Sequence, residues 1–204
     1  MHYDFDSIID RKNTNSLKWE FMEKMAPNCP EDTIPLWVAD MDFPCPAPVI
    51  EALHARVDRR IFGYSSHRDP SFLSSVTGWY RRRFGWDIPP EDLFYSPGIV
   101  PAVGYLLEIL TEPGEGVIIQ TPVYYPFESM IRNHGRKTVS NPLKEQGLCY
   151  TMDFDDLARK AEAPDTRLLI LCSPHNPVGR VWKEEELLRL GSICFENVVK
   201  IIAD

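Results

Sequence analysis

The sequence predicts an α/β fold in which a mostly parallel sheet is flanked by helices. From about residue 100 onward, short apolar runs alternate with longer segments whose apolar residues recur at helical spacing. Runs such as 117–120 and 167–172 are nearly continuous in Val, Ile and Leu, which is typical of strands buried on both faces. Strands and helices that alternate in this way indicate a parallel sheet covered by helices.

Two helices are predicted before the alternating region. The first spans 46–60 and opens with a proline. It carries apolar residues at helical spacing, namely Val49, Ile50, Leu53 and Val57. The second spans 69–85, where Asp69 is a candidate N-cap, Pro70 occupies the first turn and Gly85 ends the helix.

The alternating elements follow in order. Helices are predicted over 100–116, 124–135, 154–162 and 183–196. Strands are predicted over 117–120, 136–140, 167–172 and 198–203. Open α/β sheets bind ligands at the carboxyl ends of their strands, so we expect function at QTPVYYPF (120–127), CSPHNPVG (172–179) and Asp204.

The composition is that of an ordinary globular protein of 204 residues, with 44% hydrophobic and 25% charged residues. The formal net charge of −8 argues against a nucleic-acid partner, which would require a clustered basic face. The basic run at 81–84 ends a predicted helix, where cations complement the helix dipole.

The five cysteines are scattered and never occur in a Cys-x-x-Cys spacing, so we expect neither a metal site nor a disulfide framework. The first residues carry charges where a signal peptide needs an apolar stretch. No run reaches the roughly 18 apolar residues of a membrane span. We therefore expect a cytoplasmic protein without a membrane partner.

The loop after the strand at 167–172 is the strongest candidate for chemistry. Pro174 and Pro177 fix the backbone at two points, and Gly179 permits a turn that other residues disfavour. Asn176 stands between the prolines. Taken alone, it could equally serve as an Asx turn that bonds its own backbone.

Three further segments are weak signals of function by themselves and indicate a site only together with this loop. SPGIVPAV (96–103) is a glycine-containing turn before a helix, where free amides can bind phosphate. TPVYYPF (121–127) presents Tyr124 and Tyr125 beside the sheet edge, although aromatic residues after a strand more often belong to the core. Asp204 could likewise be a solvated strand end.

In this order and at these intervals, the segments resemble the pyridoxal-phosphate (PLP) enzymes of fold type I, the aspartate aminotransferase superfamily. The resemblance is sharpest for the branch of cystathionine β-lyases and related carbon–sulfur lyases. The motifs that carry it are RKNTNSLKW (11–19), WVADMDFPCPAPV (37–49), FGYSSH (62–67), SPGIVPA (96–102), TPVYYPF (121–127) and SPHNPVGRVW (173–182).

The resemblance assigns a cofactor role to each segment. Asp204 matches the aspartate that bonds the protonated pyridine nitrogen, and Asn176 matches the donor to the phenolic oxygen of the ring. Tyr124 matches the aromatic residue that stacks on the ring, with Tyr125 the less favoured choice. The phosphate-binding backbone amides match Gly98, Ile99 and Val100. His175 could be an acid–base group, but packing beside the site is the preferred interpretation.

The resemblance also implies how substrate and subunits meet. Trp37 and Ala39 lie where the family's N-terminal segment closes over the substrate, and Ala39 aligns with a main-chain contact to the substrate carboxylate. Tyr64 matches a phosphate-binding tyrosine contributed by the second subunit, which implies a homodimer. Residues 1–45 correspond to an arm and part of the small domain, and 46–204 to the first part of the PLP-binding large domain.

The family's Schiff-base lysine follows the aspartate matched by Asp204 and sits in a Ser-x-x-Lys setting, which no lysine here occupies. Lys200 is nearest, but it lies inside the last predicted strand. We therefore expect a large domain incomplete at its C-terminus, a fragment that cannot turn over substrate by itself.

For the intact protein, the resemblance implies a PLP-dependent carbon–sulfur β-lyase that releases thiol, pyruvate and ammonia from cystathionine or another cysteine thioether. The alternatives are an aminotransferase, which shares every early step, and an inactive or regulatory aminotransferase-like protein.

Overall fold

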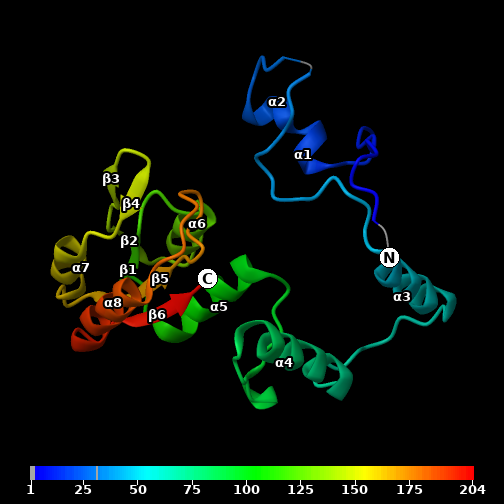
Figure 1. The fold of residues 1–204 in the computed structure, drawn as a ribbon. Coiled ribbons are helices and arrows are strands. Elements are labelled where there is room, and N and C mark those ends of the chain that lie inside the picture. The colour runs from blue at the N-terminus through cyan, green and yellow to red at the C-terminus, as the bar shows by residue number, and fades with distance from the viewer. Residues whose placement is uncertain (1–2, 31) are drawn as a thin grey trace. The chain divides into compact units, whose positions relative to one another are not determined.

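The structure is a computed structural model that describes residues 3–30 and 32–204. It contains two compact units, one running to Ser66 and the other from His67 to Asp204 (Figure 1). The division at residue 45 predicted above concerns functional domains rather than packing units, and it stays a prediction. Within the described residues, no helix combines the length and the apolar character needed to cross a membrane.

The first unit contains three helices: α1 (Leu17–Glu20), α2 (Met22–Met25) and α3 (Ala47–Asp58). Helix α3 confirms the element predicted over 46–60, and its apolar residues do recur on one face. None of the residues of α3 is buried, however, and Leu53 and Val57 are both 57% exposed. Helical spacing therefore predicted the helix correctly, while its four apolar residues stay 40–57% exposed.

The second unit begins with α4 (Pro70–Phe84), which confirms the predicted cap residues. The Asp69 carboxylate accepts hydrogen bonds from the backbone amides of Ser71 and Phe72, and this satisfies two of the free donors at the helix start. Gly85 ends the helix in the left-handed region with φ +64°, where glycine carries no steric penalty. The short 3₁₀ helix η1 (Pro90–Asp92) follows.

The main sheet has four parallel strands in the order β2-β1-β5-β6. They are β1 (Gly116–Ile119), β2 (Lys137–Ser140), β5 (Thr166–Leu171) and β6 (Lys200–Ala203). All four predicted strands are present, and their parallel pairing confirms the predicted sheet type. The central strands β1 and β5 are almost wholly buried, as their Val, Ile and Leu content requires.

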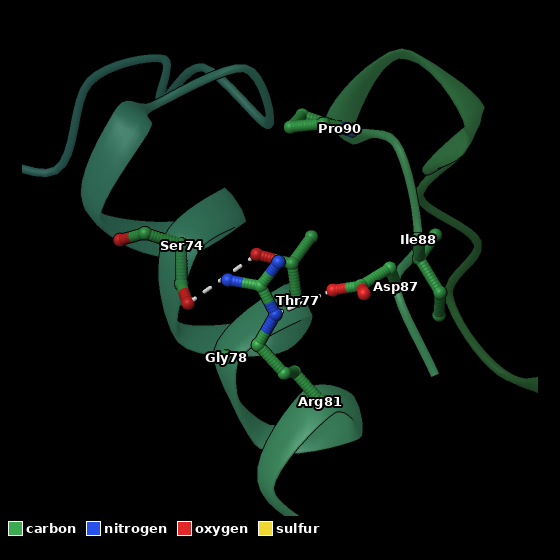
Figure 2. Close-up of a pocket in the computed structure, with 7 residues that line it drawn as sticks. All are labelled: Ser74, Thr77, Gly78, Arg81, Asp87, Ile88 and Pro90. Atoms are coloured by element: carbon green, nitrogen blue, oxygen red, sulfur yellow. Dashed lines mark hydrogen bonds and ion pairs between the residues drawn. The ribbon is translucent and has the colours of Figure 1, made fainter. Parts of the chain in front are cut away.

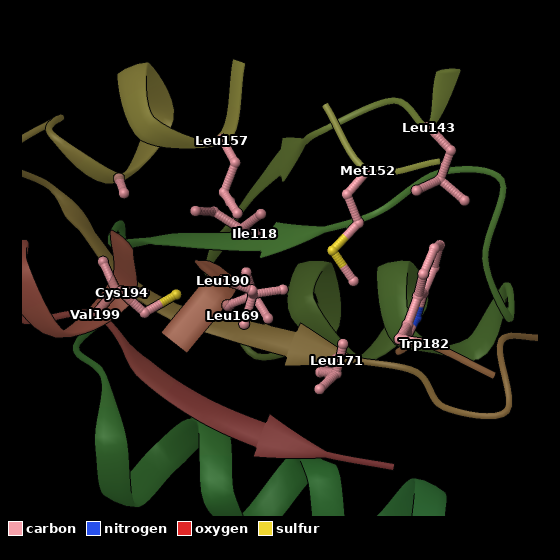
Figure 3. Packing of buried hydrophobic residues seen from close by; sticks show 11 residues of the cluster. Ile118, Leu143, Met152, Leu157, Leu169, Leu171, Trp182, Leu190, Cys194 and Val199 are labelled. Carbon is pink, nitrogen blue, oxygen red and sulfur yellow. The ribbon is translucent and has the colours of Figure 1, made fainter. Parts of the chain in front are cut away.

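Helices cover both faces of this sheet. They are α5 (Ile99–Leu110), α6 (Pro126–Asn133), α7 (Phe154–Ala161) and α8 (Glu184–Glu196). Ile118 and Leu169 point to the face covered by α7 and α8, where they pack with Leu157 and Leu190 (Figure 3). The alternate strand residues meet the other face and pack on α5 and α6: Val117, Ile119, Leu168 and Ile170. The fold is a three-layer α/β/α arrangement, as predicted.

The structure adds a small hairpin that was not predicted. Strands β3 (Lys144–Gln146) and β4 (Cys149–Thr151) pair antiparallel, separate from the main sheet. Gly147 begins their turn with φ +65°. The hairpin residues are mostly polar and exposed, so they lack the apolar alternation that identifies a strand in sequence.

Candidate functional site

The structure places three of the predicted cofactor residues at the ends of three neighbouring strands. Tyr124 follows β1, Asn176 follows β5 and Asp204 follows β6. Because β1, β5 and β6 are adjacent and parallel, their carboxyl ends lie at one edge of the sheet. This is the position at which open α/β sheets bind ligands.

Asp204 is held in register with the end of β5 by two backbone hydrogen bonds. Its amide donates to the carbonyl oxygen of Leu171 at 2.8 Å, and its own carbonyl oxygen accepts from the amide of Ser173 at 2.9 Å. The residue is exposed, which leaves its carboxylate accessible at the strand end. The parallel ladder therefore fixes the backbone of Asp204 beside the loop that carries Asn176.

Cys172 lies directly beneath this edge and was not singled out from the sequence. Its side chain is buried, with Sγ 3.7 Å from Oδ2 of Asp204 and 3.4 Å from the amide nitrogen of Asn176, which donates to it. Burial raises the pKa of the Cys172 thiol, and the neighbouring Asp204 carboxylate adds to this effect, although the Asn176 amide opposes it. The thiol therefore stays protonated at neutral pH and can donate to Asp204. The sequence feature that could have identified Cys172 as a site residue is its position at the end of the predicted strand 167–172.

The two tyrosines after β1 differ in their surroundings. The ring of Tyr124 meets Phe127 edge-on at 5.5 Å between centroids, and Phe127 belongs to the core under α5 and α6. Tyr125 is 76% exposed and contacts Tyr124 at 5.7 Å. Tyr124 is thus anchored to the core while Tyr125 is not, which supports the choice of Tyr124 as the aromatic platform.

Gly98, Ile99 and Val100 form the first turn of α5. Gly98 has φ +133°, a conformation that residues with a Cβ rarely adopt. No side chain in the described part of the chain caps this helix start. The first amides of α5 are therefore available to an anion, and the positive end of the helix dipole favours one.

The start of α5 lies toward the same sheet edge as the strand ends. Lys200, at the beginning of β6, donates from Nζ to the carbonyl oxygen of Leu110, the last residue of α5, at 3.2 Å. Helix and strand therefore run in opposite directions, which brings the N-terminus of α5 toward the carboxyl end of β6 (Figure 1). The same contact directs Lys200 away from Asp204, in keeping with its rejection as a Schiff-base residue.

The first unit brings together RKNTNSLKW (11–19) and WVADMDFPCPAPV (37–49), two of the motifs that resemble the lyase branch. Arg11 Nη1 lies 2.9 Å from Oδ1 of Asp42, and Lys18 Nζ lies 2.6 Å from Oδ2 of the same carboxylate. The Asp42 carboxylate also accepts from Nε1 of Trp19 at 2.9 Å. The hydrogen bond from Lys18 is the main cause of a lowered Asp42 pKa.

The predicted substrate residues lie in the segment that this cluster holds. Nε1 of Trp37 donates to the carbonyl oxygen of Lys18 at 3.1 Å, and Ala39 directly precedes Asp40, which pairs with Arg11 at 3.2 Å. Tyr64 lies near the end of the first unit and is fully exposed. The roles assigned to Trp37, Ala39 and Tyr64 stay predictions.

A cavity of about 320 Å³ lies elsewhere in the second unit, between α4 and the segment that leads to η1 (Figure 2). Arg81 projects into it and pairs with Asp87. Its lining consists of Ser74, Thr77, Gly78, Arg81, Asp87, Ile88 and Pro90. None of the predicted cofactor residues contributes to this cavity, so it is separate from the strand-end site.

Comparison with known proteins agrees with this geometry. Residues 31–204 match the family model described as aminotransferase class I and II. Cystathionine β-lyase PatB of Bacillus subtilis is 42% identical over 200 residues, which cover 98% of this chain and 51% of that protein. The chain thus spans about half the length of the curated relatives it matches.

Solved structures show the same fold. Cystalysin from Treponema denticola, which contains a pyridoxal 5′-phosphate cofactor, superposes with a TM-score of 0.93 at 40% identity and covers 100% of this chain and 52% of its own. The PLP-bound C-S lyase from Staphylococcus hominis gives a TM-score of 0.90 at 36% identity over 100% of this chain and 51% of its own. The predicted fold type I architecture is confirmed, and the chain belongs to the aminotransferase class I and II family.

Proposed function

We propose that the protein is a PLP-dependent carbon–sulfur β-lyase of the cystathionine β-lyase type, which releases thiol, pyruvate and ammonia from a cysteine thioether. The observation that carries the proposal is the grouping of Tyr124, Asn176 and Asp204 at one sheet edge, toward which the start of α5 is also directed. The names of the similar proteins, a cystathionine β-lyase and a C-S lyase, support this reaction class.

The residues at this edge fit the chemical groups of PLP one by one. The uncapped amides of Gly98, Ile99 and Val100 suit a phosphate. The exposed carboxylate of Asp204 suits a protonated pyridine nitrogen, and the amide of Asn176 suits a phenolate oxygen. The core-anchored ring of Tyr124 offers a flat apolar face. When bound, PLP supplies an electron-withdrawing ring that stabilises negative charge on the substrate carbon.

Each residue then has a definite task. Asp204 keeps the pyridine proton in place, and the Cys172 thiol beside it can orient the carboxylate by donating to Oδ2. Asn176 would donate a hydrogen bond to the phenolate oxygen of the ring, and the aromatic ring of Tyr124 would pack against the cofactor. Stabilisation of charge that develops only during the reaction is the form of binding that raises the rate.

The remaining parts of the proposal concern substrate, assembly and location. Cystathionine or another cysteine thioether is the substrate, Ala39 offers its main chain to the substrate carboxylate, and Trp37 closes the site. Tyr64 reaches the phosphate from the second subunit of a homodimer. Residues 1–45 act as the arm and part of the small domain, residues 46–204 as the first part of the cofactor domain, and the enzyme works in the cytoplasm.

The test uses the protein expressed from its complete gene. We expect PLP to bind, and L-cystathionine to yield pyruvate and thiol without added 2-oxoglutarate. The variant Asp204→Asn removes the negative charge at the pyridine nitrogen and should lower kcat by at least about a hundredfold, whereas Asp165→Asn, an exposed carboxylate paired with Lys137, should leave it unchanged.

The family description favours one competing activity, that of an aminotransferase. Glutamate that forms only when 2-oxoglutarate is present, with no release of pyruvate from cystathionine, would replace the lyase assignment by that one. PLP binding with neither product would indicate a non-catalytic protein, and absence of PLP binding would overturn the proposal as a whole.

A further inference from the structure

His175 connects the two loops that carry Tyr124 and Asn176. Its side chain is 1% exposed, and Nε2 lies 2.9 Å from the carbonyl oxygen of Pro122 in the loop after β1. Tyr124 stands two residues after Pro122, and Asn176 directly follows His175. One buried side chain thus spans from the loop after β5 to the loop after β1.

We propose that His175 is a positioning residue, whose Nε2–H···O bond to Pro122 sets the distance between the ring of Tyr124 and the amide of Asn176. The inference rests on the proposed function in one respect: the ring of Tyr124 and the amide of Asn176 must bind the same cofactor. The hydrogen bond itself is independent of that function.

The backbone of His175 is fixed from both sides, so the side chain has a rigid base. Its amide donates to the carbonyl oxygen of Arg180 at 2.8 Å, and its own carbonyl oxygen accepts from the amide of Gly179 at 2.7 Å. The imidazole meets the indole of Trp182 edge-on at 5.4 Å between centroids. His175 therefore cannot shift without breaking the turn that follows it.

This turn is attached to the rest of the fold by Arg180. Its guanidinium lies 4.4 Å from the ring centroid of Trp182 and 2.5 Å from Oε2 of Glu186 in α8. The indole Nε1 of Trp182 donates to the carbonyl oxygen of Cys172 at 2.9 Å, at the end of β5. The loop after β5 is thereby held by both β5 and α8, and His175 links it to the loop after β1.

The chemistry of the contact requires one tautomer. A carbonyl oxygen only accepts hydrogen bonds, so the ring proton must sit on Nε2. Nδ1 is buried and has no hydrogen-bond partner among the residues that the structure describes. An acid–base role would need a nitrogen that reaches solvent or substrate, whereas here one ring nitrogen is engaged and the other is buried.

The first test is NMR of the protein expressed from its complete gene with ¹⁵N-labelled histidine. We expect the His175 ring to show the Nε2–H tautomer, with Nδ1 as the unprotonated nitrogen. A proton on Nδ1 and none on Nε2 would overturn the proposal, whether or not PLP binds.

The second test compares two matched variants. His175→Phe keeps an aromatic ring against Trp182 but removes the donor, and His175→Gln keeps an N–H near the position of Nε2 but removes the ring. We expect the Kd for PLP to rise about tenfold in His175→Phe and to stay within about threefold in His175→Gln, because only His175→Phe removes the hydrogen bond that joins the two loops. The Tyr124 resonances should shift in the first variant and return toward wild type in the second.

Leu157→Ala is the control for a general loss of stability, because it removes a fully buried side chain of α7 without removing any hydrogen bond of the two loops. We expect it to lower Tm while leaving PLP affinity near wild type. Wild-type affinity in His175→Phe, or equal weakening in both His175 variants, would overturn the positioning role. If the wild type binds no PLP, the proposed function fails, and the tautomer together with the Tyr124 shifts still decides this inference.

Discussion

The ammonium group of Lys18 lies 2.6 Å from Oδ2 of Asp42, although the two residues are 24 positions apart in the sequence. Lys18 is nearly buried, with a side chain 6% exposed, and it also donates to the carbonyl oxygen of Asp40 at 2.9 Å. A buried ammonium group requires such partners, because desolvation of an unpaired charge is costly. The Lys18–Asp42 ion pair therefore links the segment that contains Ala39 to helix α1.

Loss of the Lys18–Asp42 ion pair should destabilise the first unit. Lys18→Ala leaves the Asp42 carboxylate with fewer partners and opens a gap beneath it, so we expect faster limited proteolysis within 37–43 and a Tm lower by about 5 °C. Lys12→Ala, an exposed lysine of the same motif, is the matched control and should behave as wild type. Equal protease resistance of both variants would contradict the structural role of Lys18.

Asp156 should give the second unit a stability that depends on pH. Burial alone would raise the pKa of this carboxyl, but hydrogen bonds from Lys160, Asn141 and Arg159 outweigh it and lower the pKa from 3.8 to about 2. A lowered pKa stabilises the fold above the unfolded value near pH 4, and this contribution is lost as the pH falls toward 2. We expect it to be on the order of 1–2 kcal/mol.

Urea unfolding as a function of pH checks this expectation. Asp156→Asn should be less stable than wild type at pH 7, and the difference should disappear by about pH 2. Asp155→Asn serves as the control, because the Asp155 side chain is 91% exposed. A difference between Asp156→Asn and wild type that stays constant from pH 7 to pH 2 would show that charge is not its cause.

Four of the five cysteines should separate into reactive and protected thiols. Cys45 and Cys149 are exposed, whereas Cys172 and Cys194 are buried. Burial raises the pKa of Cys194 to about 11, which leaves almost no thiolate at neutral pH. With a thiol reagent and peptide mass spectrometry, we expect fast labelling of the exposed pair and labelling of Cys172 and Cys194 only in denaturant. Rapid labelling of Cys194 in the folded protein would contradict the described packing.

The core between the sheet and α7/α8 should be sensitive to cavities. Leu169 is fully buried at the centre of β5, in contact with the cluster that contains Leu157 and Leu190 (Figure 3). Leu169→Ala should lower the free energy of unfolding by about 2–5 kcal/mol in urea titrations. Leu148→Ala, at a turn position that is 99% exposed, should change it by less than about 0.5 kcal/mol.

The sequence could predict the elements of the second unit because each has a local cause. Val and Ile runs mark the strands, Asp69 and Gly85 mark the ends of α4, and the order of strands and helices implies a parallel sheet. The same local reasoning missed the β3–β4 hairpin, whose polar residues carry no periodic signal. It predicted the helix α3 correctly, whereas the exposure of its residues could not be read from their spacing.

By itself, the sequence determined which residues end each strand, and therefore that Tyr124, Asn176 and Asp204 would share an edge once the strands lay parallel and adjacent. Only the tertiary structure decided that Cys172 reaches Asp204 and that His175 reaches Pro122. These contacts depend on the register between strands and on the path of two loops. Both are set by packing between residues distant in the chain, for which no local pattern exists.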